Sequence, residues 1–271
     1  MYFKLAFVSV FLLSFSNTLL AQKNTGHIKF LQITHQKDSL SAGTMARYSL
    51  FYKEKEITYM DLQDRTPIPA KVENGEMSLV VPGGKGMPKV YSYQNLTTKT
   101  LKFAEIFGPG SKLSVVDNMT TISWKLSKNT KKIQNIQCFS AQAEYRGRVW
   151  TAWYAPSIPV SSGPWLLYGL PGMILEAEDL SKTVKFICEG VIISSENVEV
   201  SEPKSNSSDG KFINNKDLPK IVKEKLENTA KLMSDKSMSL SFGVSSIEIF
   251  DFEKDLSIKR IQQKLSDIPK K

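Results

Sequence analysis

The sequence predicts an α+β protein that is mainly antiparallel β, with one curved or partly open sheet and one or two C-terminal helices. Apolar and polar residues alternate with a period of two from residue 27 onward, which is typical of half-buried strands. The hydrophobic content of 41% is sufficient for a globular core without additional cross-links. Helical periodicity becomes apparent only after the polar loop at residues 204–210.

Short alternating segments separated by charged or small residues predict an antiparallel meander in the N-terminal half. These segments are Ile28–Ile33, Tyr48–Tyr52, Ile57–Leu62 and Met77–Val81. A loop is expected at Pro82–Gly86, because glycine permits positive φ and proline cannot donate to a strand ladder. Lys89–Tyr93 and Lys99–Ile106 then predict a hairpin around the polar residues 94–98.

The C-terminal region carries the helical signals. Leu218–Leu232 is expected to be a helix, with Asp217 as its N-cap and Pro219 in its first turn. Ser245–Phe250 reads as a last strand, and Lys254–Leu265 as an amphipathic helix. The sequence has no internal repeat and no clear linker, so residues 22–271 are expected to form a single domain.

The first 21 residues have the order of a secretory signal peptide. A short start with one lysine precedes the apolar run Leu5–Phe15, and small and polar residues lead to Ala21. The apolar run of about 11 residues is well under the roughly 20 that cross a bilayer. We expect cleavage after Ala21 and export to the periplasm, the outer-membrane surface or the medium. An uncleaved anchor remains an alternative, because Leu19 is larger than the residue usually preferred three positions before the cut.

The chain is basic, with 36 Lys and Arg against 27 acidic residues. Removal of residues 1–21 takes away Lys4 alone, which leaves a net charge of +8. The lysines are spread along the chain rather than concentrated with interleaved aromatics, so a nucleic-acid partner is not expected. A solvated basic surface that favours anionic envelope components is the expected consequence.

Two cysteines remain after signal removal, Cys138 and Cys188, and two interpretations are open. A disulfide would close 50 residues of chain in an oxidising compartment and restrict the unfolded state by about 4 kcal/mol. Alternatively, both lie among apolar residues, where a thiol packs as a small hydrophobe. A nucleophilic role is disfavoured, because no histidine follows His35 to act as a base.

Familiar catalytic and metal-binding signatures are absent from the sequence. Two histidines, His27 and His35, and two distant cysteines do not predict a zinc site, and no G-x-S-x-G run appears. We therefore expect no metal, no cofactor and no catalytic residue of a known type. Glu176 and Glu178 would share a strand face and form either paired carboxylates, a calcium site or an ordinary solvated edge.

Residues 122–190, which we call the signature segment, contain an ordered series of motifs rich in tryptophan, glycine and proline. The series comprises Ile122–Leu126, Lys132–Cys138, Tyr145–Arg148, Ala152–Ala155, Ile158–Val160, Gly163–Pro164 and Gly169–Glu176. It resembles the GLPGLI family of exported proteins from Bacteroidota, with Met173 in place of the second leucine. The resemblance implies no established activity and no catalytic residues. It also implies a partner among envelope proteins, since such genes often lie near those of outer-membrane receptors.

Within the signature segment, Arg148–Tyr154 predicts a strand with Trp150 and Tyr154 on one face and Trp153 on the other. Two more strands are expected at Met173–Glu178 and Thr183–Ile193. Gly169, Leu170, Pro171 and Gly172 form the signature turn, in which Pro171 and Gly172 suit the centre of a type II turn.

Two interpretations of these residues are open. In the first, the segment is a packing motif, with glycines for close approach, prolines for bends and tryptophans as filling. In the second, the aromatic residues Trp150, Trp153, Tyr154 and Trp165 frame a binding site. Arg146 and Arg148, pointing to one side of a strand, would then bind a carboxylate or phosphate.

The function expected from the sequence is that of a non-catalytic binding or interaction module of the cell envelope. An enzyme whose carboxylates and arginines converge only in three dimensions is the first alternative. A structural companion of an outer-membrane receptor is the second.

Overall fold

The computed structural model describes residues 25–36, 39–68, 91–106, 112–193, 198–205, 207, 210–225 and 228. Five predicted features lie outside this part of the chain and remain predictions. They are the signal peptide at 1–21, the strand Met77–Val81, the loop Pro82–Gly86, the strand Ser245–Phe250 and the helix Lys254–Leu265.

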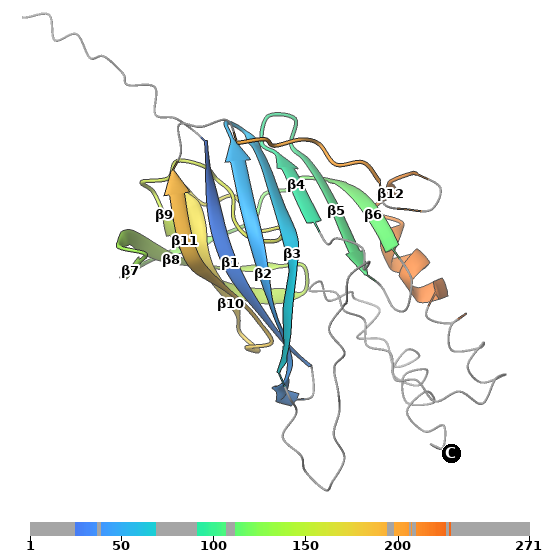
Figure 1. Cartoon of the computed structure of the whole chain (residues 1–271), viewed down its shortest axis with the longest axis horizontal. Coiled ribbons are helices and arrows are strands. Elements are labelled where there is room, and N and C mark those ends of the chain that lie inside the picture. The colour runs from blue at the N-terminus through green and yellow to red at the C-terminus, as the bar shows by residue number, and fades with distance from the viewer. Residues whose placement is uncertain are drawn as a thin grey trace, which may run out of the picture.

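The described residues form one twelve-stranded sheet and one short helix, so the predicted fold class is confirmed (Figure 1). The order in the sheet is β12-β6-β5-β4-β3-β2-β1-β11-β10-β9-β8-β7. The strands are β1 Thr25–Gln36, β2 Ser39–Lys53, β3 Glu56–Ile68, β4 Tyr91–Asn95, β5 Thr100–Ile106, β6 Lys112–Asn118, β7 Lys125–Ile133, β8 Ile136–Tyr145, β9 Arg148–Ala155, β10 Met173–Asp179, β11 Val184–Ile193 and β12 Ile213–Asn214.

From β1 to β6 and from β7 to β11, strands that follow one another in the chain pair antiparallel, whereas β6 and β7 do not pair and β12 pairs parallel with β6. The predicted hairpin at residues 94–98 is β4 and β5, whose register joins Asn95 to Thr100. β1, β2 and β3 are 12 to 15 residues long, two to three times the length of the segments predicted for them. β11 pairs with β1, so strands β7–β11 continue the sheet on the far side of β1 from β2.

The sheet curves strongly, as the hydrogen bonds of Ser162 to two distant strands show. The side chain of Ser162 donates to Gln94 Oε1 on β4 at 2.9 Å, while its carbonyl accepts from Ile174 N on β10 at 2.8 Å. β4 and β10 are five strands apart, which corresponds to about 24 Å in a flat sheet. One residue contacts both strands only because the sheet bends around it.

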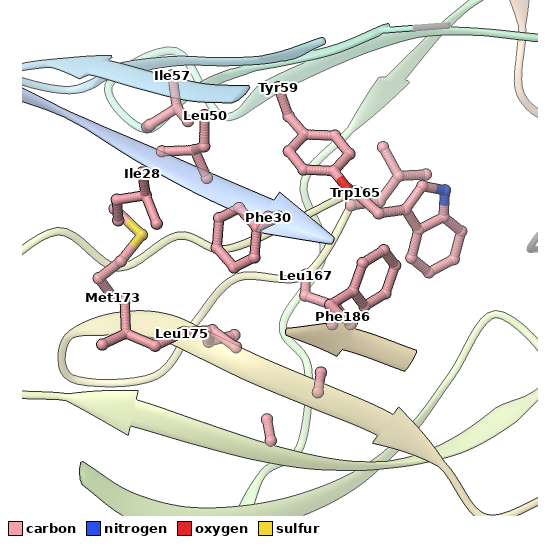
Figure 2. Packing of buried hydrophobic residues seen from close by; sticks show 14 of the residues in the cluster. Ile28, Phe30, Leu50, Ile57, Tyr59, Trp165, Leu167, Met173, Leu175 and Phe186 are labelled. Atoms are coloured by element: carbon pink, nitrogen blue, oxygen red, sulfur yellow. The ribbon is translucent and has the colours of Figure 1, made fainter. Parts of the chain in front are cut away.

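Residues 156–172, which we call the signature loop, connect β9 to β10 and fill the space inside this curve. The loop contributes many buried apolar side chains to the main core: Ile158, Val160, Trp165, Leu166, Leu167 and Leu170. Figure 2 shows Trp165 and Leu167 facing the side chains that β1, β2 and β3 direct inward. The hydrophobic core is therefore shared between the sheet and a loop that has no ladder of its own.

A helix at residues 218–225 lies beside β6, near the β12 edge of the sheet (Figure 1). Its first turn is as predicted: Ile221 N donates to the carbonyl of Asp217 at 3.1 Å, and Pro219 occupies a position that needs no amide donor. Leu218 and Val222 are fully buried and attach the helix to the core. In the part of the chain that is described, no helix has the length and hydrophobicity to cross a membrane.

Candidate binding site

The signature loop is anchored to β4 by buried polar groups. Ser92 Oγ donates to the carbonyl of Trp165 at 2.5 Å, and Gln94 Nε2 lies 3.4 Å from the carbonyl of Leu167. Trp124, which lies outside the loop, donates from Nε1 to the carbonyl of the loop residue Tyr168 at 2.8 Å. A loop enclosed by a sheet must satisfy its carbonyl groups inside the protein, and these side chains do so.

The signature turn differs from the predicted type II turn. A type II turn would bond Met173 N to the carbonyl of Leu170, but Met173 N donates to Ile158 O at 3.0 Å. Gly172 N instead donates to Leu170 O at 2.8 Å, which makes Pro171 the centre of a three-residue γ-turn. Gly172 has φ of 147°, and a Cβ there would lie 2.3 Å from the carbonyl oxygen of Ala155. Only glycine, which has no Cβ, fits where these two backbone segments approach each other.

Two of the predicted aromatic site residues, Trp150 and Trp165, are core residues. Trp150 is 0% and Trp165 3% exposed, with their ring centroids 5.7 Å apart. The Trp150 ring also stacks on Phe186 of β11, at 5.9 Å. Trp165 has φ of 56°, a strained conformation for a bulky residue that persists only where its surroundings enforce it. The pair thus joins the signature loop to the sheet.

Arg146 and Arg148 do not point to one side of a strand as predicted. Arg146 and Gly147 have φ of 48° and 73° and form the two-residue turn between β8 and β9, so only Arg148 belongs to a strand. Arg146 Nη2 donates to Asp117 Oδ2 at 2.7 Å. Asp117 belongs to β6, so this contact crosses the interior of the curved sheet. Its guanidinium also lies 5.1 Å from the centre of the Phe103 ring. The sequence suggested extended backbone because arginine rarely adopts positive φ.

Arg148 belongs to a separate buried network around Asp179, at the end of β10. Arg148 Nη1 donates to Asp179 Oδ2 at 2.8 Å, and the two side chains are 10% and 2% exposed. The carboxylate also accepts from Val184 N, at 2.7 Å, and from the hydroxyls of Ser181 and Thr183. Burial alone would raise the pKa of Asp179, but these hydrogen bonds and the Arg148 charge outweigh it and lower the pKa.

The remaining predicted site residues, Trp153 and Tyr154, lie on opposite faces of β9, as the alternation predicted. Tyr154 is buried beside Phe139 of β8, with ring centroids 6.1 Å apart. Trp153 is partly exposed on the other face, where the ammonium of Lys131 lies 4.6 Å from a ring centroid. The six predicted residues are therefore divided among the core, the Asp117 contact, the Asp179 network and the outer face. Their role as one binding site remains a prediction.

Glu176 and Glu178 each pair with a lysine of another strand. Lys131 on β7 contacts Glu176, and Lys185 on β11 lies 3.4 Å from Glu178. Each carboxylate is therefore balanced by its own cation. Within the described ranges no cluster of three or more His, Cys, Asp and Glu residues has the arrangement of a metal site. These ion pairs do not favour a calcium site, and β10 lies between β9 and β11 rather than at an edge of the sheet.

Cys138 and Cys188 are both free thiols and both buried in the structure. Burial raises the pKa of Cys138 to about 11 and that of Cys188 to about 12. A nucleophilic thiolate is therefore scarce at neutral pH, in agreement with the sequence argument against a catalytic cysteine.

A feature that the sequence analysis missed is the outer edge of the sheet, β7, which we call the β7 edge. Its first six residues, Lys125–Thr130, are all exposed, and the whole strand carries four lysines and no acidic residue. Lys131 pairs with Glu176, while Lys125, Lys128 and Lys132 have no ion pair with any residue that the structure describes. The signal is present in the sequence as four lysines within eight residues, but the spread of lysines over the whole chain hides it.

The fold and these contacts define the class of protein: a mainly antiparallel, open-sheet β-protein with a buried Gly/Pro-rich loop. A family model described as a protein of unknown function (Porph_ging) matches residues 144–176, from the end of β8 through the signature loop into β10. The match covers the segment in which the Arg146, Arg148 and Trp165 contacts occur.

No curated protein matches the chain. Two solved structures of PNGF-II, in space groups P21 and C2, are similar in part, each with 12% sequence identity. The TM-scores are 0.42 and 0.44, and the matches cover 64% of this chain. They cover 29% and 28% of the PNGF-II chains, so this chain matches less than a third of their length.

Proposed function

We propose that this chain is an exported cell-envelope protein of the GLPGLI type and acts as a non-catalytic interaction module. The signal-like residues 1–21 and the motif series of the signature segment support the export and family parts of the proposal. The contact surface in this proposal is the β7 edge, and the partner is an envelope protein with an acidic surface, such as an outer-membrane receptor.

The observation that carries the proposal is the unbalanced charge of the β7 edge. Lys125, Lys128 and Lys132 extend along roughly 20 Å of strand with no described counter-charge. Leu126, which is 61% exposed, supplies an apolar contact between them. Lysines on a sheet edge prevent two copies from pairing through it, because like charges repel, and they attract an acidic surface.

The shape of the β7 edge favours contact through side chains rather than addition of a further strand. The pairing of β7 with β8 is interrupted between Leu126 and Thr130, where the register shifts. A bulge of this kind twists an edge and disrupts the backbone groups that a new strand would need. The arginine and aromatic residues of the signature segment then serve to hold the fold.

The test is capture of partners from envelope extracts by three forms of the immobilised protein. The first is the wild type, and the second is Lys125→Gln/Lys128→Gln/Lys132→Gln. The third carries Lys53→Gln/Lys55→Gln/Lys216→Gln, a control with the same loss of charge at exposed positions away from β7. Mass spectrometry of both proteins and small molecules identifies what is retained.

We expect a stoichiometric protein partner on the wild type and the control, released by moderate salt and absent from the β7 variant. Salt releases it because charges at an exposed edge are screened beyond about 8 Å at physiological ionic strength. Recovery of the same partner on all three forms would contradict the β7 assignment. Recovery of a small molecule without a protein partner would favour a ligand-binding site or an enzyme.

A further inference from the structure

The two cysteines of the chain, 50 residues apart in sequence, lie in segments that pack against each other. Cys138 is on β8 close to the β7–β8 turn, and Cys188 is on β11. In the sheet order β8 and β11 are separated by β9 and β10, so flat pairing would hold them apart. The hairpin of β7 and β8 instead reaches back to β11.

Three contacts place the hairpin end and Cys138: one reaches β11, one reaches β10 and one lies within β8. Gln134, in the turn, donates from Nε2 to the carbonyl of Cys188 at 3.2 Å. Cys138 Sγ donates to the carbonyl of Ile136, two residues beyond Gln134, at 3.4 Å. Lys131, the register partner of Cys138, contacts Glu176 of β10. The hairpin end therefore lies over β10 and β11, with both cysteines beside the same turn.

Burial and electrostatics agree with this placement. Cys138 is 0% and Cys188 3% exposed, and both belong to the main hydrophobic core. A charge on Cys138 raises the pKa of Cys188, and Glu176 raises the pKa of both, so the two thiols share one environment.

We propose that Cys138 and Cys188 form a disulfide that joins the end of the β7–β8 hairpin to β11. The proposal rests on the proposed function, because export would place the protein in an oxidising environment. It deepens that function, because the bond would hold the β7 edge in place. The free thiols in the structure correspond to the reduced form.

The reaction is thiol–disulfide exchange with an oxidant of the disulfide class. The thiolate of one cysteine attacks a sulfur of the oxidant, which releases one thiol and leaves a mixed disulfide on the protein. The second cysteine then attacks the protein sulfur and releases the second thiol. Overall, two protein thiols are oxidised to one disulfide, and one oxidant disulfide is reduced to two thiols.

The buried setting predicts when the bond forms. In the folded reduced protein the raised thiol pKa values leave very little thiolate at neutral pH, so exchange is slow. During folding the cysteines are accessible and have ordinary pKa values, so the bond forms as the hairpin docks on β11, before the core closes around both sulfurs. Once formed it is shielded from reducing agents by the same core.

The test refolds the full chain in a buffer of oxidised and reduced glutathione and then counts thiols after unfolding and alkylation. We expect no alkylated cysteine, a mass lower by two hydrogens and a linked pair of peptides that contain Cys138 and Cys188. Reduction should lower the Tm of the wild type by about 8 to 16 °C, because a 50-residue loop is released. Cys138→Ala and Cys188→Ala should show no such response.

Two alkylated cysteines per unfolded chain, or glutathione adducts on either cysteine, would overturn the proposal. The thiol count is decisive even if an alanine variant fails to fold, since it uses only the wild type. The result is also separable from the proposed function. The Lys125→Gln/Lys128→Gln/Lys132→Gln variant should keep its disulfide whether or not it loses a partner.

Discussion

Substitution of Asp179 by asparagine tests the buried network that closes the β10–β11 hairpin. The change keeps the shape of the side chain and removes its charge. Arg148, which is 10% exposed, would then lose its buried counter-charge, since it contacts the Asp179 carboxylate at 2.8 Å. The single amide oxygen introduced by Asp179→Asn would also have to accept the hydrogen bonds that the carboxylate accepts from Val184 N and two hydroxyls.

The expected cost follows from the burial of the pair. Removing one partner of a buried ion pair typically destabilises a protein by about 3 to 5 kcal/mol. Glu178→Gln provides the matched control one residue away. Glu178 and Lys185 are 3.4 Å apart and each 40% exposed, and an exposed pair contributes about 0 to 1 kcal/mol.

The assay is urea unfolding of the wild type and both variants, followed by tryptophan fluorescence, since Trp150 and Trp165 lie in the core. We expect the free energy of unfolding to fall by about 3 to 5 kcal/mol for Asp179→Asn and by less than about 1 kcal/mol for Glu178→Gln. Equal losses in the two variants would refute the reasoning that the Arg148–Asp179 pair is a buried structural network.

The remaining predictions concern acid stability and two glycines. The pKa of Asp179 is lower in the fold than its ordinary 3.8, so its stabilisation is complete above about pH 3.8 and is lost as the pH falls through the folded pKa. The difference in free energy of unfolding between wild type and Asp179→Asn, measured by urea unfolding on both sides of that pH, should therefore shrink on the acid side. A difference that does not change with pH would contradict the lowered pKa of Asp179. Gly172→Ala should cost about 2 to 5 kcal/mol, because φ is 147° and the new Cβ would meet the carbonyl of Ala155. Gly190→Ala, with nothing within 4 Å of its Cβ, should change the Tm little, and similar Tm values for the two variants would disprove the close approach at Gly172.

The sequence predicts the sheet well because strand faces repeat every two residues and are visible locally. The alternation in residues 148–154 assigns Trp150 and Tyr154 to one face and Trp153 to the other, and burial confirms it. The β4–β5 hairpin and the start of the helix at Asp217 are also local signals of turn and cap residues.

The contacts that decide the candidate site depend on distant segments. Arg146 meets Asp117, 29 residues away, only because the sheet curves, and period-two alternation contains no information on curvature. Trp150 and Trp165 are equally compatible, in sequence alone, with a pocket and with a core. Their burial is decided by the signature loop lying inside the curve, where Ser162 joins β4 to β10.

The central claim is that the signature loop is an internal structural element around which the sheet closes. Amide hydrogen exchange tests this most directly at Gly172, Met173 and Ile174, whose N–H groups donate to Leu170, Ile158 and Ser162. If the loop is part of the core, these amides should exchange only through global unfolding, with the same opening free energy as those of Phe30 and Leu50 in β1 and β2. Exchange of these three amides within seconds to minutes, while the β1 and β2 amides stay protected, would contradict the claim.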